Sequence, residues 1–231
     1  MKVKLISYSQ PQDEQRHIAP PNSVLDLIAF CARVSNPDNQ MNTATSEKLV
    51  KYLIKNKHWS PLEMVSTCLE IETTRDIARQ ILRHRSFSFQ EFSQRYADPT
   101  MELEFCNREA RFQDPTNRQN SIDIDVLDED QRRVNEMFRM KQNKLLRHVK
   151  KTYDWAISNG IAKEQARAVL PEGLTNSRMY VNGTLRSWIH YIELRGSNGT
   201  QKEHMEIAHA CADVIAKIFP LSLDYKQNSI V

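Results

Sequence analysis

The amino-acid sequence predicts a protein of mixed class, α/β or α+β, for two reasons. Residues 64–72 (MVSTCLEIE) alternate so that Val65, Thr67, Leu69 and Ile71 share one side, and a period of two is typical of a β-strand. Residues 128–158 carry apolar side chains at helical spacing, which predicts one long amphipathic helix. A chain with both patterns combines helices and strands in its fold.

The segments before and after the strand 64–72 favour helices. Residues 24–34 (VLDLIAFCARV) predict the first helix, with Ser23 or Asn22 as its cap. Residues 47–57 predict a second, since Leu49, Val50, Leu53 and Ile54 fall on one face. The chain then turns at Pro61, and after the strand a further helix begins at about Thr74 and runs through 75–85, with a buried stripe of Ile77, Ala78, Ile81 and Leu82.

The second half of the chain is dominated by the long helix 128–158. Its first turn is acidic, which suits the helix dipole, and Asn159-Gly160 ends it. Val134, Met137, Phe138, Leu145 and Val149 form its apolar seam. The other elements are a strand-and-loop segment at 99–125, a short helix at 162–169, a strand around 176–183, and helices at roughly 184–195 and 201–218.

Composition excludes several classes of protein. The 231 residues fit one large domain or two small ones, and a net charge of +3 with pI near 8.6 is too mild for a general polyanion binder. Cys31, Cys68, Cys106 and Cys211 form no CxxC, so we expect reduced thiols and no zinc site. Neither a signal peptide nor an apolar stretch of membrane-spanning length is found, which favours a cytoplasmic protein.

Glycine is scarce, and this limits how the protein can bind a nucleotide. All five glycines lie in the last third of the chain, so neither GxGxxG nor the Walker phosphate loop is present. Side chains, rather than a glycine-rich backbone, would have to contact any phosphate groups.

Positive charge gathers between Arg75 and Arg95, where five arginines face only two acids. On a helix over 75–85, Arg75, Arg79 and Arg83 would share one face at i, i+4 and i+8. Arginine is suited to bidentate recognition of phosphate and carboxylate. The alternative is a solvated helix face, with Phe87, Phe89 and Phe92 as core residues rather than ring stackers.

A second basic cluster lies downstream. Arg167 precedes Pro171, and the helix 184–195 carries Arg186 and His190 at i, i+4 and ends at Arg195. Surface charges and a helix-face histidine are the alternative interpretation of these residues.

At this point the sequence resembles a known family. RHRSFSFQEFS (83–93) fits the RHR-x7-S signature of the flavin-dependent thymidylate synthases. The neighbouring segments ARVS (32–35), HWSPLE (58–63), EQARAVLP (164–171) and GTLRSWIHYIELR (183–195) resemble other elements of that family. The resemblance covers roughly residues 24–218.

The resemblance implies a single domain over 1–231, with a central antiparallel sheet flanked by long helices. It implies reductive methylation of dUMP to dTMP, with methylenetetrahydrofolate as carbon donor, FAD as redox mediator and NADPH as reductant. It also implies a homotetramer with shared active sites, and a mechanism without a cysteine nucleophile. Neither nucleic acid, nor a membrane, nor a metal is expected as a partner.

Carried over by motif position, the site residues fall into two sets. The expected dUMP contacts are Gln80, Arg83, Glu91, Ser93, Gln94, Arg95, Arg167 and Arg195. The expected FAD contacts are Ser60, Arg83, His84, Arg85, Glu91, Thr184, Arg186 and His190. Arg195 would be the catalytic residue, because its charge would favour the N3-deprotonated uracil. The resemblance gives no role to Gln201 or His204.

Two other interpretations remain open on the sequence. The basic stretch Arg75–Arg95 would also suit a nucleic-acid-binding module with phenylalanine stacking. A relative that kept the fold and lost turnover is the other, and the joint presence of Arg83, Ser93, Arg95, Arg167 and Arg195 argues against it.

Overall fold

The computed structural model of the chain describes residues 1–12, 23–197 and 199–226. The helices are α1 (Val24–Ala32), α2 (Ser46–Lys55), α3 (Arg75–Ile81), α4 (Pro99–Glu102), α5 (Glu129–Ser158), α6 (Lys163–Ala166), α7 (Leu185–Arg195) and α8 (Lys202–Ile215). The strands are β1 (Lys2–Tyr8), β2 (Ser66–Thr74), β3 (Ser88–Glu91), β4 (Arg111–Gln113), β5 (Ser121–Asp123) and β6 (Asn176–Thr184). Short 3-10 segments are η2 (Pro37–Asn39), η3 (Ser60–Met64), η4 (Arg167–Val169) and η5 (Pro220–Tyr225).

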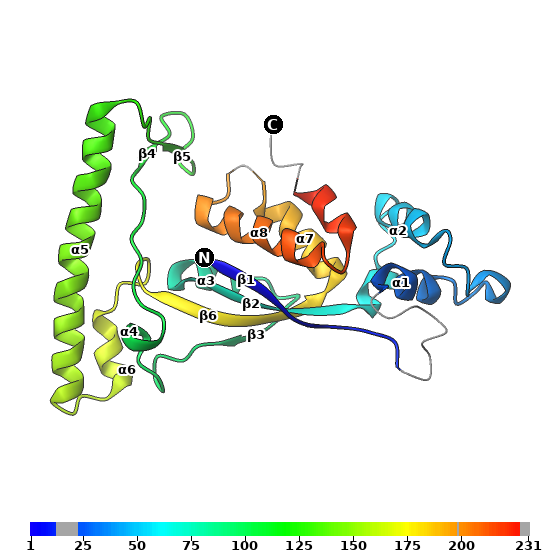
Figure 1. Cartoon of the computed structure of the whole chain (residues 1–231), viewed down its shortest axis with the longest axis horizontal. Helices are drawn as coiled ribbons and strands as arrows, with labels where there is room; N and C mark the ends of the chain where they lie inside the picture. The colour runs from blue at the N-terminus through cyan, green and yellow to red at the C-terminus, as the bar shows by residue number, and fades with distance from the viewer. Residues whose placement is uncertain (13–22, 198, 227–231) are drawn as a thin grey trace.

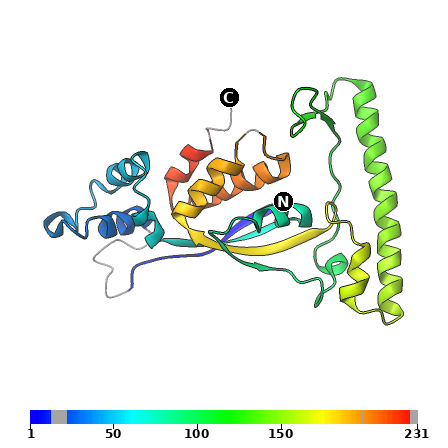
Figure 2. The same cartoon turned by 180° about the vertical axis from the view of Figure 1, so that it is seen from behind.

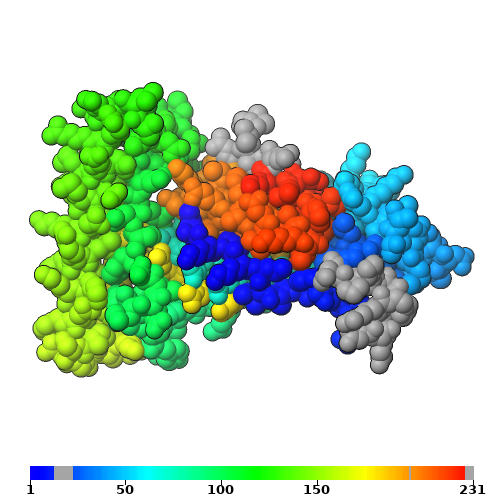
Figure 3. Space-filling model, in the orientation of Figure 1, coloured from blue at the N-terminus to red at the C-terminus, as the bar shows by residue number. Residues whose placement is uncertain are grey.

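An antiparallel sheet in the order β1-β2-β6-β3 forms the centre of the molecule (Figure 1). The mixed class with an antiparallel sheet is therefore confirmed. The alternation predicted for 64–72 is also confirmed, because Val65, Thr67, Leu69 and Ile71 are fully buried. The edge strand β1 was not predicted; it pairs with β2 and lies at the surface beside α8 (Figure 3).

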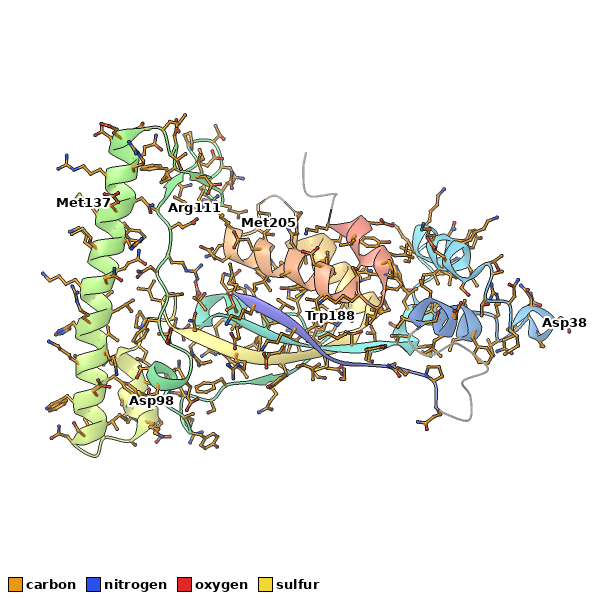
Figure 4. The ribbon with its side chains drawn as sticks, viewed as in Figure 1. Asp38, Asp98, Arg111, Met137, Trp188 and Met205 are labelled. Carbon is orange, nitrogen blue, oxygen red and sulfur yellow. The ribbon has the colours of Figure 1, made fainter. Side chains whose placement is uncertain are left out.

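The main core lies between this sheet and the helices α7 and α8, which cover one of its faces (Figure 1). Trp188 of α7 lies over the sheet, and its indole N–H donates to the Thr67 carbonyl at 3.0 Å (Figure 4). Phe87 packs against Trp188 with ring centroids 4.6 Å apart, and Phe89 packs against the same core. These two phenylalanines are therefore packing residues.

The long helix α5 stands at the opposite end of the sheet from α1 and α2 (Figures 1 and 2). Its C-terminal half packs on α6 through a second, smaller cluster of Val149, Tyr153, Ala156, Ala166 and Leu170. Of the predicted apolar seam, Val149 is buried, whereas Val134, Met137, Phe138 and Leu145 are between 41% and 48% exposed. The upper half of α5, with Met137, extends beyond that cluster (Figure 4).

Several predicted boundaries differ from the structure. Helix α1 ends at Ala32 and is capped by Ser23, whereas Asn22, the other candidate cap, lies outside the described residues. The segment 99–125 contains α4 and the small β4–β5 hairpin. Among the described residues, no helix combines the length and apolar character needed to cross a membrane. The prediction of a single domain stays a prediction.

The register of β2 and β6 explains how distant site residues meet. Ser66 pairs with Thr184 and Thr74 pairs with Asn176, so α3 and α7 start at opposite ends of one strand pair. Nine residues of strand span roughly 30 Å, while the seven of α3 and eleven of α7 together span about 27 Å. Because both helices turn back along the sheet, their C-terminal ends meet over its middle.

Candidate active site

The RHR signature lies on a turn rather than on a helix. Helix α3 ends at Ile81, and the His84 N–H donates to the Ile81 carbonyl at 3.0 Å. The expectation that the helix continues through 85 is therefore wrong. The turn buries Phe87 and leads directly into β3, which pairs with β6. Arg83 and Arg85 are exposed on this turn, while His84 is half-buried.

The end of α7 brings Arg195 onto that turn. Its Nε donates to His84 Nε2 at 3.0 Å. A ring nitrogen accepts only when it is unprotonated, and burial, Arg195 and Arg83 together lower the pKa of His84 to about 4. The Tyr191 ring packs edge-on against His84 with centroids 5.0 Å apart. Neutral His84 thus orients the Arg195 side chain without competing with it for an anion.

The arginines divide by whether a carboxylate neutralises them. Among the described residues, Arg83, Arg85, Arg167 and Arg195 have no carboxylate within ion-pair distance. Arg75 is different, because it is 8% exposed and pairs with Glu91 and Glu172. Of the predicted shared face of Arg75, Arg79 and Arg83, the first two hold, because both pair with Glu172, whereas Arg83 lies beyond the end of α3. The unpaired set is the one available to an anionic ligand.

Gln80, on the last turn of α3, joins a network that the sequence did not predict. Its Oε1 lies 3.1 Å from Nδ1 of His204, and its Nε2 donates to Gln201 Oε1 at 2.9 Å. His204 is fully buried, and its Nε2 lies 3.1 Å from the Tyr191 hydroxyl. One signal was available in the sequence. His204 precedes Ile207, Ala208 and Cys211 at i+3, i+4 and i+7, the buried face of α8.

Three predicted dUMP contacts lie at the end of β3: Glu91 is its last residue, and Ser93 and Gln94 follow it. Glu91 accepts a hydrogen bond from Ser177 Oγ at 2.8 Å and contacts Arg75, so its carboxylate is engaged within the chain. The Ser93 hydroxyl accepts from the Arg95 N–H at 3.4 Å. Gln94 is 4% exposed, and its Nε2 has no hydrogen-bond partner among the described residues.

Arg95 and Arg167 are brought to the same end of the molecule. Arg95 pairs with Glu164 of α6 at 3.1 Å, and Arg167 follows Glu164 by three residues, close to one helical turn. Figure 1 shows α6 beside α5, at the end of the sheet away from α1. The phosphate contacts proposed for Ser93 and Arg95 therefore lie with Arg167 in space.

The remaining predicted FAD contacts lie where β6 meets α7. Ser60 begins η3 and lines a hollow of about 430 Å³ together with Cys31. Arg186 pairs with Glu63, and His190 packs edge-on against Trp59 with centroids 4.5 Å apart. Burial, followed by Arg186, lowers the pKa of His190.

Thr184 caps α7 and connects this region to the signature turn. Its Oγ1 accepts from the Ser187 N–H at 3.3 Å, and Ser187 Oγ donates to the Ser86 carbonyl at 3.3 Å. The structure therefore links the region of Ser60, Arg186 and His190 to the region of Arg83, His84 and Arg195. Strand β3 runs along β6 away from the start of α7 and towards α6, so the region of Ser93, Arg95 and Arg167 lies apart from both within one chain (Figure 1).

The fold and the site together define a class of protein. An antiparallel α+β fold brings unpaired arginines to a turn where the half-buried His84 accepts from Arg195, and its sequence lacks a glycine-rich loop. Such a protein binds anionic ligands through side chains.

Comparison with known proteins identifies the family. The family model described as "Thymidylate synthase complementing protein" matches residues 16–221. A "Probable flavin-dependent thymidylate synthase" of Paramecium bursaria Chlorella virus 1 is 49% identical over 220 residues, covering 95% of this chain and 96% of that protein. A "Flavin-dependent thymidylate synthase" of Synechocystis sp. is 46% identical with the same coverage. The chain therefore belongs to the thymidylate synthase complementing protein family, that of the flavin-dependent thymidylate synthases, which confirms the resemblance of its RHR-x7-S signature.

A solved structure supports the fold. The crystal structure of the UMP/dUMP methylase PolB from Streptomyces cacaoi bound with 5-Br dUMP superposes with a TM-score of 0.75. It is 22% identical and covers 98% of this chain and 94% of its own chain. This similarity concerns the fold.

Proposed function

We propose that this chain catalyses the reductive methylation of dUMP to dTMP as a FAD-dependent methyltransferase. Methylenetetrahydrofolate would provide the carbon and NADPH the electrons. The observation that carries the proposal is the meeting of Arg195 with the signature turn, where His84 holds an unpaired guanidinium 3.0 Å away. Membership of the flavin-dependent thymidylate synthase family supports it.

Arg195 is the proposed catalytic residue. Its Nε is occupied by His84, which leaves the two terminal nitrogens for a ligand. A guanidinium beside uracil stabilises the anion formed when N3 loses its proton. The negative charge that results is shared with C5 and raises its nucleophilicity towards the incoming carbon.

The proposed dUMP contacts are Gln80, Arg83, Glu91, Ser93, Gln94, Arg95 and Arg167 together with Arg195. The state of Glu91 and Arg95 adds a condition, because each is paired within the chain, with Ser177 and Glu164 respectively. Phosphate binding would therefore compete with Glu164 for Arg95. Arg167, which has no carboxylate partner among the described residues, is the stronger phosphate ligand of the two.

The residues present fit FAD as the cofactor. The unpaired Arg83 and Arg85 match a pyrophosphate, and Ser60, His84, Glu91, Thr184, Arg186 and His190 are the other proposed contacts. The edge-to-face pair of Trp59 and His190 adds an aromatic wall. FAD, when bound, supplies the redox chemistry between the reductant and the transferred carbon.

A cysteine nucleophile is not required, and the structure supports its exclusion. Burial raises the pKa of all four thiols, and Cys211 lies fully buried in the core. Activated cysteines show the opposite shift. A variant with all four cysteines replaced by alanine, if folded and loaded with FAD, should still methylate dUMP. Total loss of methylation in that variant would contradict this part of the proposal.

We also propose a cytoplasmic homotetramer, with a single domain per chain and active sites shared between chains. Two observations support sharing. The Ser93–Arg167 region is separate from the Arg83–Arg195 region within one chain, and α5 exposes Met137, Phe138 and Leu145. An exposed apolar face of this kind is usual for an interface.

The nucleic-acid alternative loses its main support. A continuous basic patch from Arg75 to Arg95 is not present, because Arg75 is buried and Arg79 and Arg95 are paired with carboxylates. Colourless protein with salt-sensitive oligonucleotide binding would revive it.

The test is the absorbance spectrum of the purified protein near the flavin band, with bleaching by NADPH measured with and without dUMP. Absence of bound flavin, and failure to reconstitute with FAD, would refute the proposal.

Arg195→Ala should abolish most turnover while flavin stays bound. Arg79→Ala is the matched control, because this arginine is exposed and paired with Glu172. Equal turnover in the two variants would refute the role of Arg195.

A further inference from the structure

A chain of six side chains, joined by five polar contacts, runs from Arg108 to the buried Tyr191 of α7. Arg108 pairs with Glu203 at 2.8 Å, and Glu203 accepts from Gln201 Nε2 at 2.9 Å. Gln201 accepts from Gln80, Gln80 contacts His204, and His204 contacts the Tyr191 hydroxyl. Every residue between Arg108 and Tyr191 uses two polar atoms in this chain.

The carboxylate of Glu203 determines which group donates and which accepts in each hydrogen bond from Gln201 onward. Burial raises the pKa of Glu203, but bonding to Arg108 and other donors outweighs it, so the pKa lies below its usual value and the group only accepts. Gln201 must then turn its NH₂ to Glu203 and its carbonyl to Gln80. Gln80 turns its NH₂ to Gln201, so its carbonyl faces His204 and needs a donor there.

His204 supplies that donor as one defined tautomer. Burial, then Arg195 and His84, lower its pKa to about 3, so the ring is neutral at physiological pH. The proton must lie on Nδ1, facing Gln80, and Nε2 must accept from the Tyr191 hydroxyl. The opposite tautomer would place two acceptors face to face at 3.1 Å.

We propose that His204 is a positioning residue, which fixes the side-chain amide of Gln80 so that its free N–H donates to an acceptor oxygen of the bound nucleotide. The proposal rests on the proposed function, since Gln80 is one of the expected dUMP contacts. With its carbonyl bound to His204 and one Nε2 hydrogen bound to Gln201, Gln80 retains a second Nε2 hydrogen. If the Gln80 amide were flipped, its carbonyl oxygen would take the place of this N–H and could not donate a hydrogen bond to the nucleotide.

Two substitutions separate this role from packing. The amide nitrogen of asparagine occupies the place of histidine Nδ1, whereas that of glutamine occupies the place of Nε2. His204→Asn therefore keeps a donor for Gln80, and His204→Gln removes it. In the FAD-loaded protein, we expect calorimetry to show dUMP affinity within about threefold of the original chain for His204→Asn. For His204→Gln we expect a loss of about tenfold, equivalent to ~1.4 kcal/mol and typical of one hydrogen bond.

A double-mutant cycle tests whether the effect passes through Gln80. In a Gln80→Ala background, His204→Gln should cause no further loss of dUMP affinity. An equal loss in both backgrounds would overturn the proposal, as would unchanged affinity in His204→Gln alone.

The tautomer of His204 is measurable without any ligand. ¹⁵N NMR of histidine-labelled protein, with the signal assigned by its loss in His204→Asn, should show a neutral ring protonated on Nδ1 between pH 6 and pH 8. An Nε2–H ring, or titration in that range, would overturn the proposal even if the variants fail to fold. If the original chain does not bind dUMP, the proposed function fails, whereas an Nδ1–H ring would still support the arrangement of Gln80.

Discussion

Gly183 lies on β6 against the ring of Phe87, and replacing it by alanine should displace that ring and, with it, the RHR turn of the proposed active site. A Cβ atom at this position would lie 2.2 Å from Phe87 Cδ1 and 2.5 Å from Cε1. Carbon atoms in contact prefer roughly 3.5–4.0 Å, so the ring would have to move by about 1.5 Å. Phe87 is only 8% exposed, and the rings of Trp188 and Tyr191 pack against it.

The expected cost follows from this overlap. Overpacking of a well-packed core costs about 1–3 kcal/mol, and in a chain of this size each kcal/mol lowers Tm by roughly 2–4 °C. Gly183→Ala should therefore lower Tm by roughly 2–12 °C. Because Phe87 follows the RHR turn and its N–H donates to the His84 carbonyl, methylation should decrease as well.

The assay is thermal unfolding of the FAD-loaded protein, with Gly173→Ala as the control. A Cβ at Gly173 would meet nothing closer than 3.7 Å, which is ordinary contact, so this variant should keep its Tm. Adding Phe87→Leu to Gly183→Ala should recover part of the loss, since the overlapping ring is gone. Equal Tm values for Gly183→Ala and Gly173→Ala would refute the reasoning.

Two further predictions concern protonation and assembly. The pKa values of His84 and His204 lie at about 4 and about 3, below the ordinary 6.5, so the unfolded chain binds more protons than the folded one between those values. Stability should therefore be fully present above pH 6.5 and fall on acidification, by up to ~1.4 kcal/mol per pH unit for each histidine. Urea unfolding at pH 5 and pH 7 measures this, and a pH-independent midpoint would contradict it. Separately, Met137→Glu places a charge on the exposed apolar face of α5 and should dissociate the oligomer in analytical ultracentrifugation, whereas an unchanged mass would exclude this face as an interface.

Local patterns predicted the two central strands of the sheet, β2 and β6, and most helices correctly. The alternation in 64–72 holds because β2 is a central strand whose apolar side faces the core. Edge strand β1 was missed, although Lys2 and Lys4 alternate with Val3 and Leu5, because so short a pattern does not indicate a partner strand. Its pairing with β2 depends on contacts some 66 residues away, such as the ion pair between Lys4 and Glu70.

The errors arose where tertiary contacts decided the outcome. Helix α3 stops at Ile81 because burial of Phe87 and pairing of β3 with β6 favour a turn over continued helix. The seam of α5 follows helical periodicity, but periodicity does not say whether the same chain covers it. Here the buried cluster forms only where α5 meets α6; the other half is contacted through polar side chains such as Asn135 and Gln142, and Met137 remains exposed.

The role of each arginine depends on its partner, and the sequence could not supply partners. Arg75 and Arg83 occupy equivalent positions in the i, i+4, i+8 series, yet Glu91 and Glu172 neutralise Arg75 while Arg83 has no carboxylate among the described residues. Glu172 lies about a hundred residues away and reaches α3 because β6, which follows it, pairs with β2. A buried, paired guanidinium stabilises the fold, and its loss leaves carboxylates uncompensated. An unpaired guanidinium costs the folded chain little and remains available to an anion, which is why we place the proposed chemistry at the RHR turn rather than on the helix before it.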